Sequence, residues 1–243
     1  MGGLIESNRV EIGRVSAIYR YPVKSMRGQA LPRVEVRWNG LDGDRQYAFV
    51  KSADTSRFPW ATGRNFSDMT LWTARYDIDE KPRESHVNVT LDDGAIHAVT
   101  APELVQRLSQ DVGVPVALLH LGRGCFDSMP VSVVGQETLD DLAAKTDVPV
   151  AALRFRPNIV IDAGHERAWL GGRLAFGDSA LRLRADRPIE RCSMITLDPE
   201  TAERAPKLMR TVVEEFNNEI GIYCTPEAPG PLEVGAKAWL ERY

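Results

Sequence analysis

Residues 187–199 read Arg-Pro-Ile-Glu-Arg-Cys-Ser-Met-Ile-Thr-Leu-Asp-Pro. The single cysteine of this stretch, Cys192, lies between an arginine-rich approach and an apolar segment. Nearby positive charge favours the thiolate, and the thiolate is the form of cysteine that binds metal or attacks an electrophile. A free cysteine is more often a small buried hydrophobic residue, so a functional role for Cys192 needs support from elsewhere in the chain.

The length and composition of the chain narrow its class. With 243 residues there is room for one large domain or two small ones, and a hydrophobic content of 43% supports a real core. The formal net charge of -4 argues against a general nucleic-acid-binding surface. The first residues lack the apolar segment of a secretion signal, and no apolar run is long enough to span a bilayer. We therefore expect a cytoplasmic protein with neither a nucleic acid nor a membrane as its partner.

Residue types that bind metals are scattered along the chain. Cys125, Cys192 and Cys224 form no C-x-x-C pair, and their odd number argues against a disulfide scaffold. The four histidines include no H-x-x-x-H pair, so the sequence does not indicate a zinc site.

Short segments of alternating polar and apolar residues dominate the chain. They predict strands over residues 10–20, 31–38, 47–50, 71–78, 86–91, 95–99, 114–121, 131–134, 153–161, 174–183 (a hairpin), 220–224 and 232–240. Helices are expected over 100–112, 136–145 and 206–216, the first starting at a capping box of Thr100 and Glu103. Many short strands with few helices favour a mainly β protein with added helices (α+β), built on a β-barrel.

Basic residues recur in or beside the predicted loops, although the chain is acidic overall. Arginine and lysine grouped on loops can hold a phosphate or carboxylate, and arginine often does so with two parallel hydrogen bonds. A solvated surface position is the alternative for any one of them. The set consists of Lys24, Arg45, Arg64, Arg154, Arg156 and Arg191.

Two other polar positions stand out beside these basic residues. Asn158 lies where its segment turns apolar, and its amide could pair with the donor and acceptor edge of a heterocycle. Asp127 lies in a loop rich in turn residues. Both could instead be ordinary turn residues that need no ligand.

Several motifs, taken in order, resemble those of one family. They are Tyr21-Pro-Val-Lys-Ser25, Gly40-Leu-Asp-Gly-Asp-Arg45, Arg154-Phe-Arg-Pro-Asn-Ile-Val-Ile161, Arg191-Cys192 with Thr196-Leu-Asp-Pro-Glu-Thr201, and Gly221-Ile-Tyr223 with Leu232-Glu-Val-Gly235. Together they resemble the MOSC family, named after the C-terminal domain of molybdenum-cofactor sulfurases, and within it the bacterial relatives of the mitochondrial amidoxime-reducing component. The resemblance implies a discontinuous MOSC β-barrel of residues 10–50 and 115–243. A small inserted α+β N-terminal subdomain would occupy residues 51–114.

The resemblance also implies a molybdenum cofactor of the molybdopterin type. Cys192 would supply the protein thiolate to molybdenum, and a soft anionic sulfur suits that metal. Asp127 would stand near the metal, where its carboxylate could relay a proton to substrate. Cys192 and Asp127 are therefore the expected catalytic residues, and Cys192 is also the expected metal ligand.

Seven further residues are expected, by the same resemblance, to bind the cofactor. Its phosphate end would be held by Lys24, Ser25 and Arg45. Its pterin would be lined by Arg154, Arg156 and Asn158. Arg64 completes the set, although the residues after it depart from the loop of the relatives.

The resemblance favours an oxidoreductase that reduces N-hydroxylated or N-oxide small molecules at molybdenum. The sequence has no C-x4-C-x2-C iron–sulfur motif and no G-x-G-x-x-G fingerprint, so electrons would come from a separate electron-transfer protein. A second hypothesis is a sulfur carrier or cofactor-handling protein that bears a persulfide on Cys192. A third is a non-catalytic β-barrel binding module in which Cys192 is buried and inert.

Overall fold

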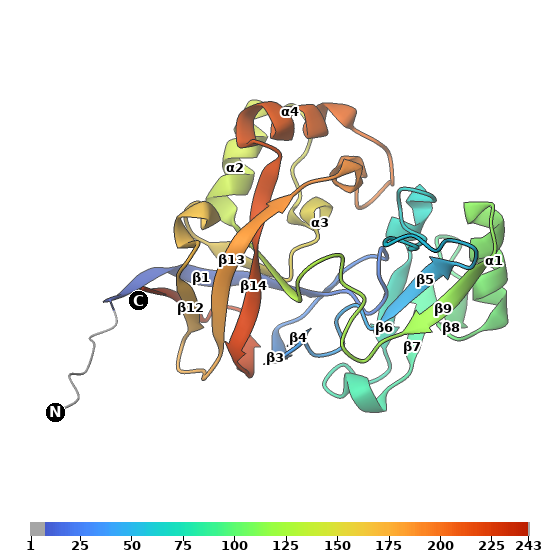
Figure 1. Cartoon of the computed structure of the whole chain (residues 1–243), viewed down its shortest axis with the longest axis horizontal. Helices are drawn as coiled ribbons and strands as arrows, with labels where there is room; N and C mark the ends of the chain where they lie inside the picture. Colours follow the sequence, from blue (N-terminus) through green and yellow to red (C-terminus); the bar gives the residue numbers. More distant parts are fainter. Residues whose placement is uncertain (1–7, 243) are drawn as a thin grey trace.

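Seven strands close into a barrel in the computed structural model, which describes residues 8–242 (Figure 1). Their hydrogen-bonded order is β11 (Ile159–Asp162), β10 (Val131–Gly135), β14 (Glu219–Ala228), β13 (Arg182–Glu190), β12 (Arg173–Phe176), β16 (Lys237–Arg242) and β1 (Asn8–Arg20). β1 pairs with β11 and closes the ring, while the short β2 (Gln29–Ala30) pairs with the end of β1. The predicted mainly β fold with added helices and a β-barrel is confirmed.

β1 is long enough to pair with two strands. Its first part pairs with β16 and its second part with β11, and an irregular register in both ladders bends the strand. Gly13 lies at the bend with φ +150°, where an added Cβ would come within 2.2 Å of the carbonyl oxygen of Asp162. A side chain at residue 13 would therefore obstruct the pairing that closes the barrel.

The barrel interior is filled by residues that face inward from its strands. Val15, Val133, Leu174 and Ile222 are completely or almost completely buried in one hydrophobic cluster. A separate three-stranded sheet of β15 (Gly230–Glu233), β3 (Arg33–Arg37) and β4 (Gly40–Leu41) adds residues to the same cluster. Alternation in β3 follows the prediction, because its two valines are buried and its charged residues are exposed.

The predicted strand over residues 232–240 is wrong in its extent. Its two halves are β15, which pairs with β3, and β16, which pairs with β1 and β12. Gly235 separates them in a turn with φ +86°, and its amide donates to the carbonyl of Val15 at 2.7 Å. The turn depends on this contact with β1, which lies far away in the sequence.

A second group of elements lies beside the barrel and has its own hydrophobic core (Figure 1). It contains the ribbon of β5 (Tyr47–Lys51) and β9 (Val116–His120), the sheet of β6 (Thr73–Tyr76), β7 (Val87–Thr90) and β8 (Ile96–Ala98), and helix α1 (Pro102–Val112). Phe49 of β5 is buried in this core with Trp72 and Leu104. The predicted division into residues 10–50 with 115–243, and 51–114, stays a prediction.

Helices α2 (Gln136–Lys145) and α4 (Pro206–Phe216) span the predicted residues. Leu139 of α2, Leu208 of α4 and Phe155 pack into a third hydrophobic cluster on the barrel. Short 3-10 turns occur at η1 (Ser67–Thr70), η2 (Pro82–Glu84), η3 (Glu166–Trp169) and η4 (Ser193–Thr196).

Helix α1 ends as predicted at Gly113, which has a left-handed conformation. Its predicted capping box is wrong, because the N-cap residue is Ala101 and no side chain caps the helix. Pro102 occupies the first helical position, so Thr100 lies one residue too early to act as the cap.

The predicted strand over residues 153–161 is wrong in its first half. Residues Ala152–Phe155 form the short helix α3, Arg156 adopts a left-handed conformation with φ +52°, and the strand β11 begins only at Ile159. Pro157 disfavours a right-handed helical conformation in the residue before it, so the helical turn has to end at Arg156. The motif therefore bends at the point where its polar residues lie.

Among residues 8–242, no helix has the length and apolar character needed to cross a membrane. Residues 1–7, in which we expected no secretion signal, lie outside the described part of the chain.

Candidate functional site

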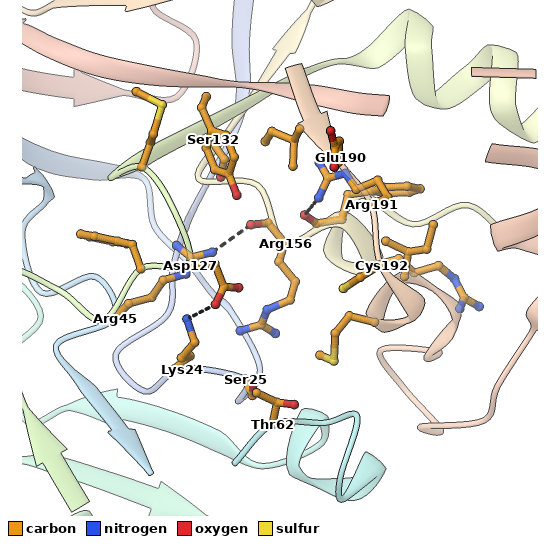
Figure 2. Close-up of a pocket in the computed structure, with 18 of the residues that line it drawn as sticks. Lys24, Ser25, Arg45, Thr62, Asp127, Ser132, Arg156, Glu190, Arg191 and Cys192 are labelled. Carbon is orange, nitrogen blue, oxygen red and sulfur yellow. Dashed lines mark hydrogen bonds and ion pairs between the residues drawn. The ribbon is translucent and has the colours of Figure 1, made fainter. Parts of the chain in front are cut away.

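A cleft opens where the barrel meets the second group of elements (Figure 2). It holds about 900 Å³ of empty space that includes open solvent. The turn after β1, the loop before η1, the loop over residues 121–130, α3 and the residues after β13 all contribute to it. Every predicted site residue lines this cleft: Lys24, Ser25, Arg45, Arg64, Asp127, Arg154, Arg156, Asn158 and Cys192.

Cys192 follows directly after β13 and occupies the N-cap position of η4. Its side chain is exposed, whereas Cys125 and Cys224 are buried. Burial raises the pKa of the Cys125 and Cys224 thiols. Figure 2 shows Cys192 at the edge of the space that Lys24 and Asp127 also face. An exposed thiol contradicts the hypothesis of a buried, inert Cys192.

Lys24 and Asp127 form an ion pair in the cleft, with Nζ 2.9 Å from Oδ1. Lys24 is 6% exposed, and its Nζ also donates to the carbonyl of Cys125 at 2.7 Å. Burial lowers the pKa of Lys24, and the charge of Asp127 opposes that shift. Ser25 follows in a left-handed conformation with φ +69°, which turns the chain sharply at the end of the predicted Tyr-Pro-Val-Lys-Ser motif.

Tyr21 contacts two arginines of the cleft, a role that the sequence analysis did not predict. The guanidinium carbons of Arg45 and Arg156 each lie 4.4 Å from the centroid of its ring. The Tyr21 hydroxyl donates to the carbonyl of Pro157 at 3.1 Å, and its amide donates to the carboxylate of Asp44 at 2.8 Å. Tyr21 therefore links the first, second and third motifs in space.

Arg45 finds most of its acceptors within the protein. Its guanidinium donates to the buried Asp44 carboxylate and to the carbonyl of Arg156 at 3.0 Å. A longer contact of 3.4 Å reaches Oδ1 of Asn158. Burial opposes the charge of Arg45, but Asp44 and Tyr21 outweigh it and raise the pKa of the guanidinium. Arg45 therefore connects Asp44 to the backbone of Arg156 in the wall of the cleft.

Arg154 also directs its donors into the protein. Its guanidinium donates to the carbonyls of Pro149 at 2.9 Å and Thr196 at 3.2 Å, and forms an ion pair with Asp198 at 2.6 Å. Burial lowers the pKa of Arg154, and Asp198 opposes that shift. These contacts fix the segment after Cys192 against α3, so Arg154 shapes the cleft even where it offers few free donors.

Asn158 is buried and lies directly before β11. Its Oδ1 accepts from the amide and the hydroxyl of Ser132 at 3.1 Å each, and its Nδ2 donates to the carbonyl of Tyr19 at 3.2 Å. The amide therefore joins three neighbouring strands. Its predicted contact with a pterin stays a prediction.

Arg64 stands at the exposed end of the cleft, in the loop before η1. Within residues 8–242, its side chain has no ion-pair partner. Its carbonyl accepts a weak contact of 3.4 Å from Arg204. Arg64 therefore presents an exposed positive charge at the mouth of the cleft, where it could contact a ligand.

Two guanidinium nitrogens in the cleft wall lack acceptors. Nη2 of Arg156 and Nη2 of Arg191 are buried without a hydrogen-bond partner in the described part of the chain. The other nitrogens of Arg191 donate to the carbonyls of Ile220 at 2.7 Å and Phe155 at 2.8 Å. Burial lowers the pKa of Arg156 and Arg191 to about 10. A buried donor without a hydrogen-bond partner costs about 1–3 kcal/mol. An anionic ligand that accepted hydrogen bonds from these nitrogens would remove this cost.

Other residues line the cleft that the sequence did not assign to it. They are Thr62, Phe126, Met129, Ser132, Phe155, Ile189, Glu190, Met194, Ile195 and Tyr223. Arg191, which the sequence analysis noted only as a loop cation, lines the cleft as well. Some of these residues flank a predicted site residue, as Phe126 does Asp127, and that proximity in sequence was their only signal. Tyr223 lies on β14, and its place depends on the pairing of β13 with β14.

Fold and site together define a β-barrel protein with an exposed thiol in a cleft lined by arginine and lysine. Comparison with family models identifies the family of this β-barrel protein. The model of the MOSC N-terminal beta barrel domain matches residues 12–117, and the model of the MOSC domain matches residues 119–238. The chain therefore belongs to the MOSC family.

Two curated relatives show the range of the family. Mitochondrial amidoxime-reducing component 1 of Homo sapiens is 28% identical over 130 residues, which is 47% of this chain and 37% of that protein. Molybdenum cofactor sulfurase of Drosophila yakuba is 31% identical over 86 residues, which is 35% of this chain and 11% of that protein. The matched regions thus span little more than a third of the first relative and about a tenth of the second.

A solved structure supports the fold. The YUAD protein from Bacillus subtilis superimposes with a TM-score of 0.54 at 15% identity, covering 98% of this chain and 99% of that one. At this identity the likeness concerns the fold alone.

The residues of the cleft fit a molybdenum cofactor of the molybdopterin type. An exposed cysteine can offer a soft thiolate to the metal. The unpartnered nitrogens of Arg156 and Arg191, with Lys24 nearby, are donors that an anionic phosphate or an oxygen-rich pterin would satisfy.

Proposed function

We propose that this protein binds a molybdenum cofactor and reduces N-hydroxylated or N-oxide small molecules. The observation that supports this most is the shared position of the exposed Cys192 thiol and the unpartnered nitrogens of Arg156 and Arg191 in one cleft. Thiolate suits molybdenum, and cationic donors suit the cofactor's phosphate. The relatives, named for amidoxime reduction and for the molybdenum cofactor, point in the same direction.

In this proposal the cofactor, when bound, supplies the two-electron redox change, and the protein binds and positions it. Cys192 provides the thiolate. Lys24, Ser25 and Arg156 bind the phosphate end, with Arg45 bracing Arg156 through its carbonyl. Arg154 and Asn158 hold the wall beside the pterin, and Arg64 contributes a charge at the mouth.

Asp127 is the proposed proton relay. Reduction of an N–OH group to N–H and water consumes two electrons and two protons, so the cleft has to deliver protons to the reacting oxygen and nitrogen. Lys24 holds the Asp127 carboxylate at 2.9 Å while leaving that side chain largely exposed, so it can exchange protons with water. The electrons come from a separate electron-transfer protein, and the proposed location is the cytoplasm.

Turnover with an artificial donor tests the proposal. Cofactor-loaded protein should reduce benzamidoxime with reduced methyl viologen and should be inert with NADH alone. Asp127→Ala should slow turnover by about 10²–10⁴-fold with unchanged molybdenum content, because its role is proton transfer and not ligation. A loaded protein with no viologen-driven turnover on several N-hydroxylated compounds would remove the reductase function.

A sulfur carrier or cofactor-handling protein is the second candidate function. The exposure of Cys192 supports it, because a persulfide has to reach a second protein. Mass spectrometry of the protein as purified should then find one extra sulfur on Cys192 and none on the buried cysteines. An unmodified Cys192 in protein that carries no molybdenum would count against both functions.

A further inference from the structure

A second, shallower groove begins beside Cys192 and runs along α4. It holds about 750 Å³ of empty space that includes open solvent. Its residues come from η4, from the segment before α4 and from α4 itself: Ser193, Thr196, Arg204, Pro206, Met209, Arg210, Val213 and Glu214. Val213 is 49% exposed, so this face of α4 presents apolar surface to solvent. Because Ser193 follows Cys192, the groove starts one residue from the thiol.

Three exposed arginines form a row from the cleft mouth into this groove. Arg64 lines the cleft, Arg204 donates to the Arg64 carbonyl at 3.4 Å, and Arg210 lines the groove together with Arg204. None of the three has an ion-pair partner within residues 8–242.

Neighbouring basic residues differ in this respect. Lys207 pairs with Asp147 at 2.7 Å, and Arg27 pairs with Glu200. Glu214 is the acidic residue in the groove lining. On a chain with a net charge of -4, the arginine row is therefore a local positive surface, with three arginines against the one acidic residue in the groove lining, Glu214.

We propose that this arginine row and the apolar face of α4 form the docking surface for an acidic one-electron carrier protein. The inference rests on the proposed function, which requires electrons from outside the chain. An apolar centre with a charged rim is the composition of a transient protein interface. Unpaired positive charge attracts an acidic partner and raises the association rate, and the effect weakens as salt screens it.

The position of the groove suits this partner better than a small ligand. A carrier docked over Val213 and the arginine row would end against η4, beside Cys192 and the mouth of the cleft. The same surface leaves the cleft open for the reducible compound, because the groove and the cleft are lined by different residues. Electrons and substrate would therefore reach the site from neighbouring directions.

Charge reversal at the groove tests the proposal in the full-length, cofactor-loaded protein. Arg210→Glu is the cleanest variant, because Arg204 also contacts the loop of Arg64. With a flavodoxin or a plant-type ferredoxin as the donor, KM for the carrier should rise about tenfold or more at low salt and approach the parent value at high salt. Viologen-driven turnover should not change, since a small donor needs no docking surface. Arg75→Glu, which reverses an exposed arginine on β6, is the matched control and should behave as the parent.

The outcomes separate this inference from the proposed function. If Arg210→Glu and the double variant Arg204→Glu/Arg210→Glu keep the parent KM for both carriers while viologen-driven turnover is intact, the docking surface is wrong. If the parent has no viologen-driven turnover, the proposed function fails, and direct binding of the two carriers still decides the inference: the variants must bind more weakly than Arg75→Glu. Loss of binding to phosphatidylserine vesicles in the same variants, with carrier binding unchanged, would assign the arginine row to a membrane and overturn the proposal.

Discussion

At the scale of single residues, the arginines of the cleft fall into two groups. One group uses its hydrogen-bond donors within the protein, and the other keeps a donor that a ligand could use. Arg45 and Arg154 donate to carboxylates and carbonyls of the protein, whereas Arg156 and Arg191 keep one buried nitrogen without an acceptor. The sequence analysis grouped Arg45 and Arg154 with the cofactor-binding residues, and their contact with a cofactor stays a prediction. A motif specifies residue type and leaves the direction of the side chain open. Arg191 was noted only for its charge, and its free nitrogen depends on the left-handed Gly221 beneath it.

Cys192 is expected to be the only cysteine needed to retain metal. Cys192→Ser removes the exposed thiol, and molybdenum per chain should fall to background. Cys125→Ser and Cys224→Ser alter buried positions and should keep molybdenum wherever they fold. Full metal occupancy in Cys192→Ser, measured by elemental analysis against the other two variants, would show that the thiolate ligand has been misassigned.

Lys24 and Arg45 should respond differently to truncation. Lys24→Ala removes a charge-assisted contact to the cofactor, which costs about 1.5–3 kcal/mol, or roughly ten- to hundredfold in affinity. Arg45→Ala leaves the buried Asp44 without its ion-pair partner, so the free energy of unfolding should fall by about 3–5 kcal/mol. Pterin content and urea denaturation of both variants measure these effects. If the two variants are equally stable and lose equal amounts of pterin, Arg45 binds the cofactor directly.

Cofactor retention should weaken at alkaline pH through Lys24. Burial, opposed by Asp127, lowers the pKa of Lys24 below the ordinary value of 10.5, so the folded protein loses this charge before the unfolded chain does. Between the pKa of Lys24 in the folded protein and its pKa in the unfolded chain, the unfolded chain binds more protons. The contribution of Lys24 to the free energy of unfolding therefore rises with pH in this range. Over the same range the site loses the positive charge that would bind the phosphate. Gel filtration at graded pH should release pterin from the parent at a lower pH than from Lys24→Arg. Identical release curves would argue against a phosphate contact at Lys24.

At the scale of elements, the sequence predicted those defined by local patterns. Helices α2 and α4 follow their apolar periodicity, and the hairpin of β12 and β13 forms about Gly177. Prediction failed where a distant contact decides the path, as at the turn of Gly235 against Val15. It also failed in the motif before β11, where Pro157 ends a helical turn inside a run that alternates like a strand.

The buried side chain of Glu166 in η3 connects β10, α2 and β14, and no sequence motif predicted this role. Its carboxylate accepts from the amide of Gly135 at 3.0 Å, the hydroxyl of Thr138 at 2.5 Å and the amide of Gly221 at 2.5 Å. Glu166→Ala strands two buried backbone donors, each worth about 1–3 kcal/mol, so the free energy of unfolding should fall by about 2–6 kcal/mol. Glu137→Ala, at an exposed position on α2, is the control for denaturant unfolding, and a similar small effect of both variants would contradict this role.

At the scale of the whole molecule, the site exists because two hydrophobic cores hold distant segments together. The barrel core fixes β10, β11 and β13, and the second core fixes the turn after β1 through Val23 and Met26. The mainly β fold followed from strand patterning, and the residues of the cleft followed from a family resemblance. Their meeting in one cleft required the barrel closure, which no local pattern encodes.

The central claim is that this cleft holds a molybdenum cofactor, and the most direct test is the metal and pterin content of the purified chain. Protein made in a host that synthesises the cofactor should carry molybdenum and pterin in equal amounts, approaching one of each per chain. Lys24→Ala should lose both, and Cys192→Ser should lose the metal. A parent protein with neither molybdenum nor pterin, purified from such a host in folded form, would contradict the account.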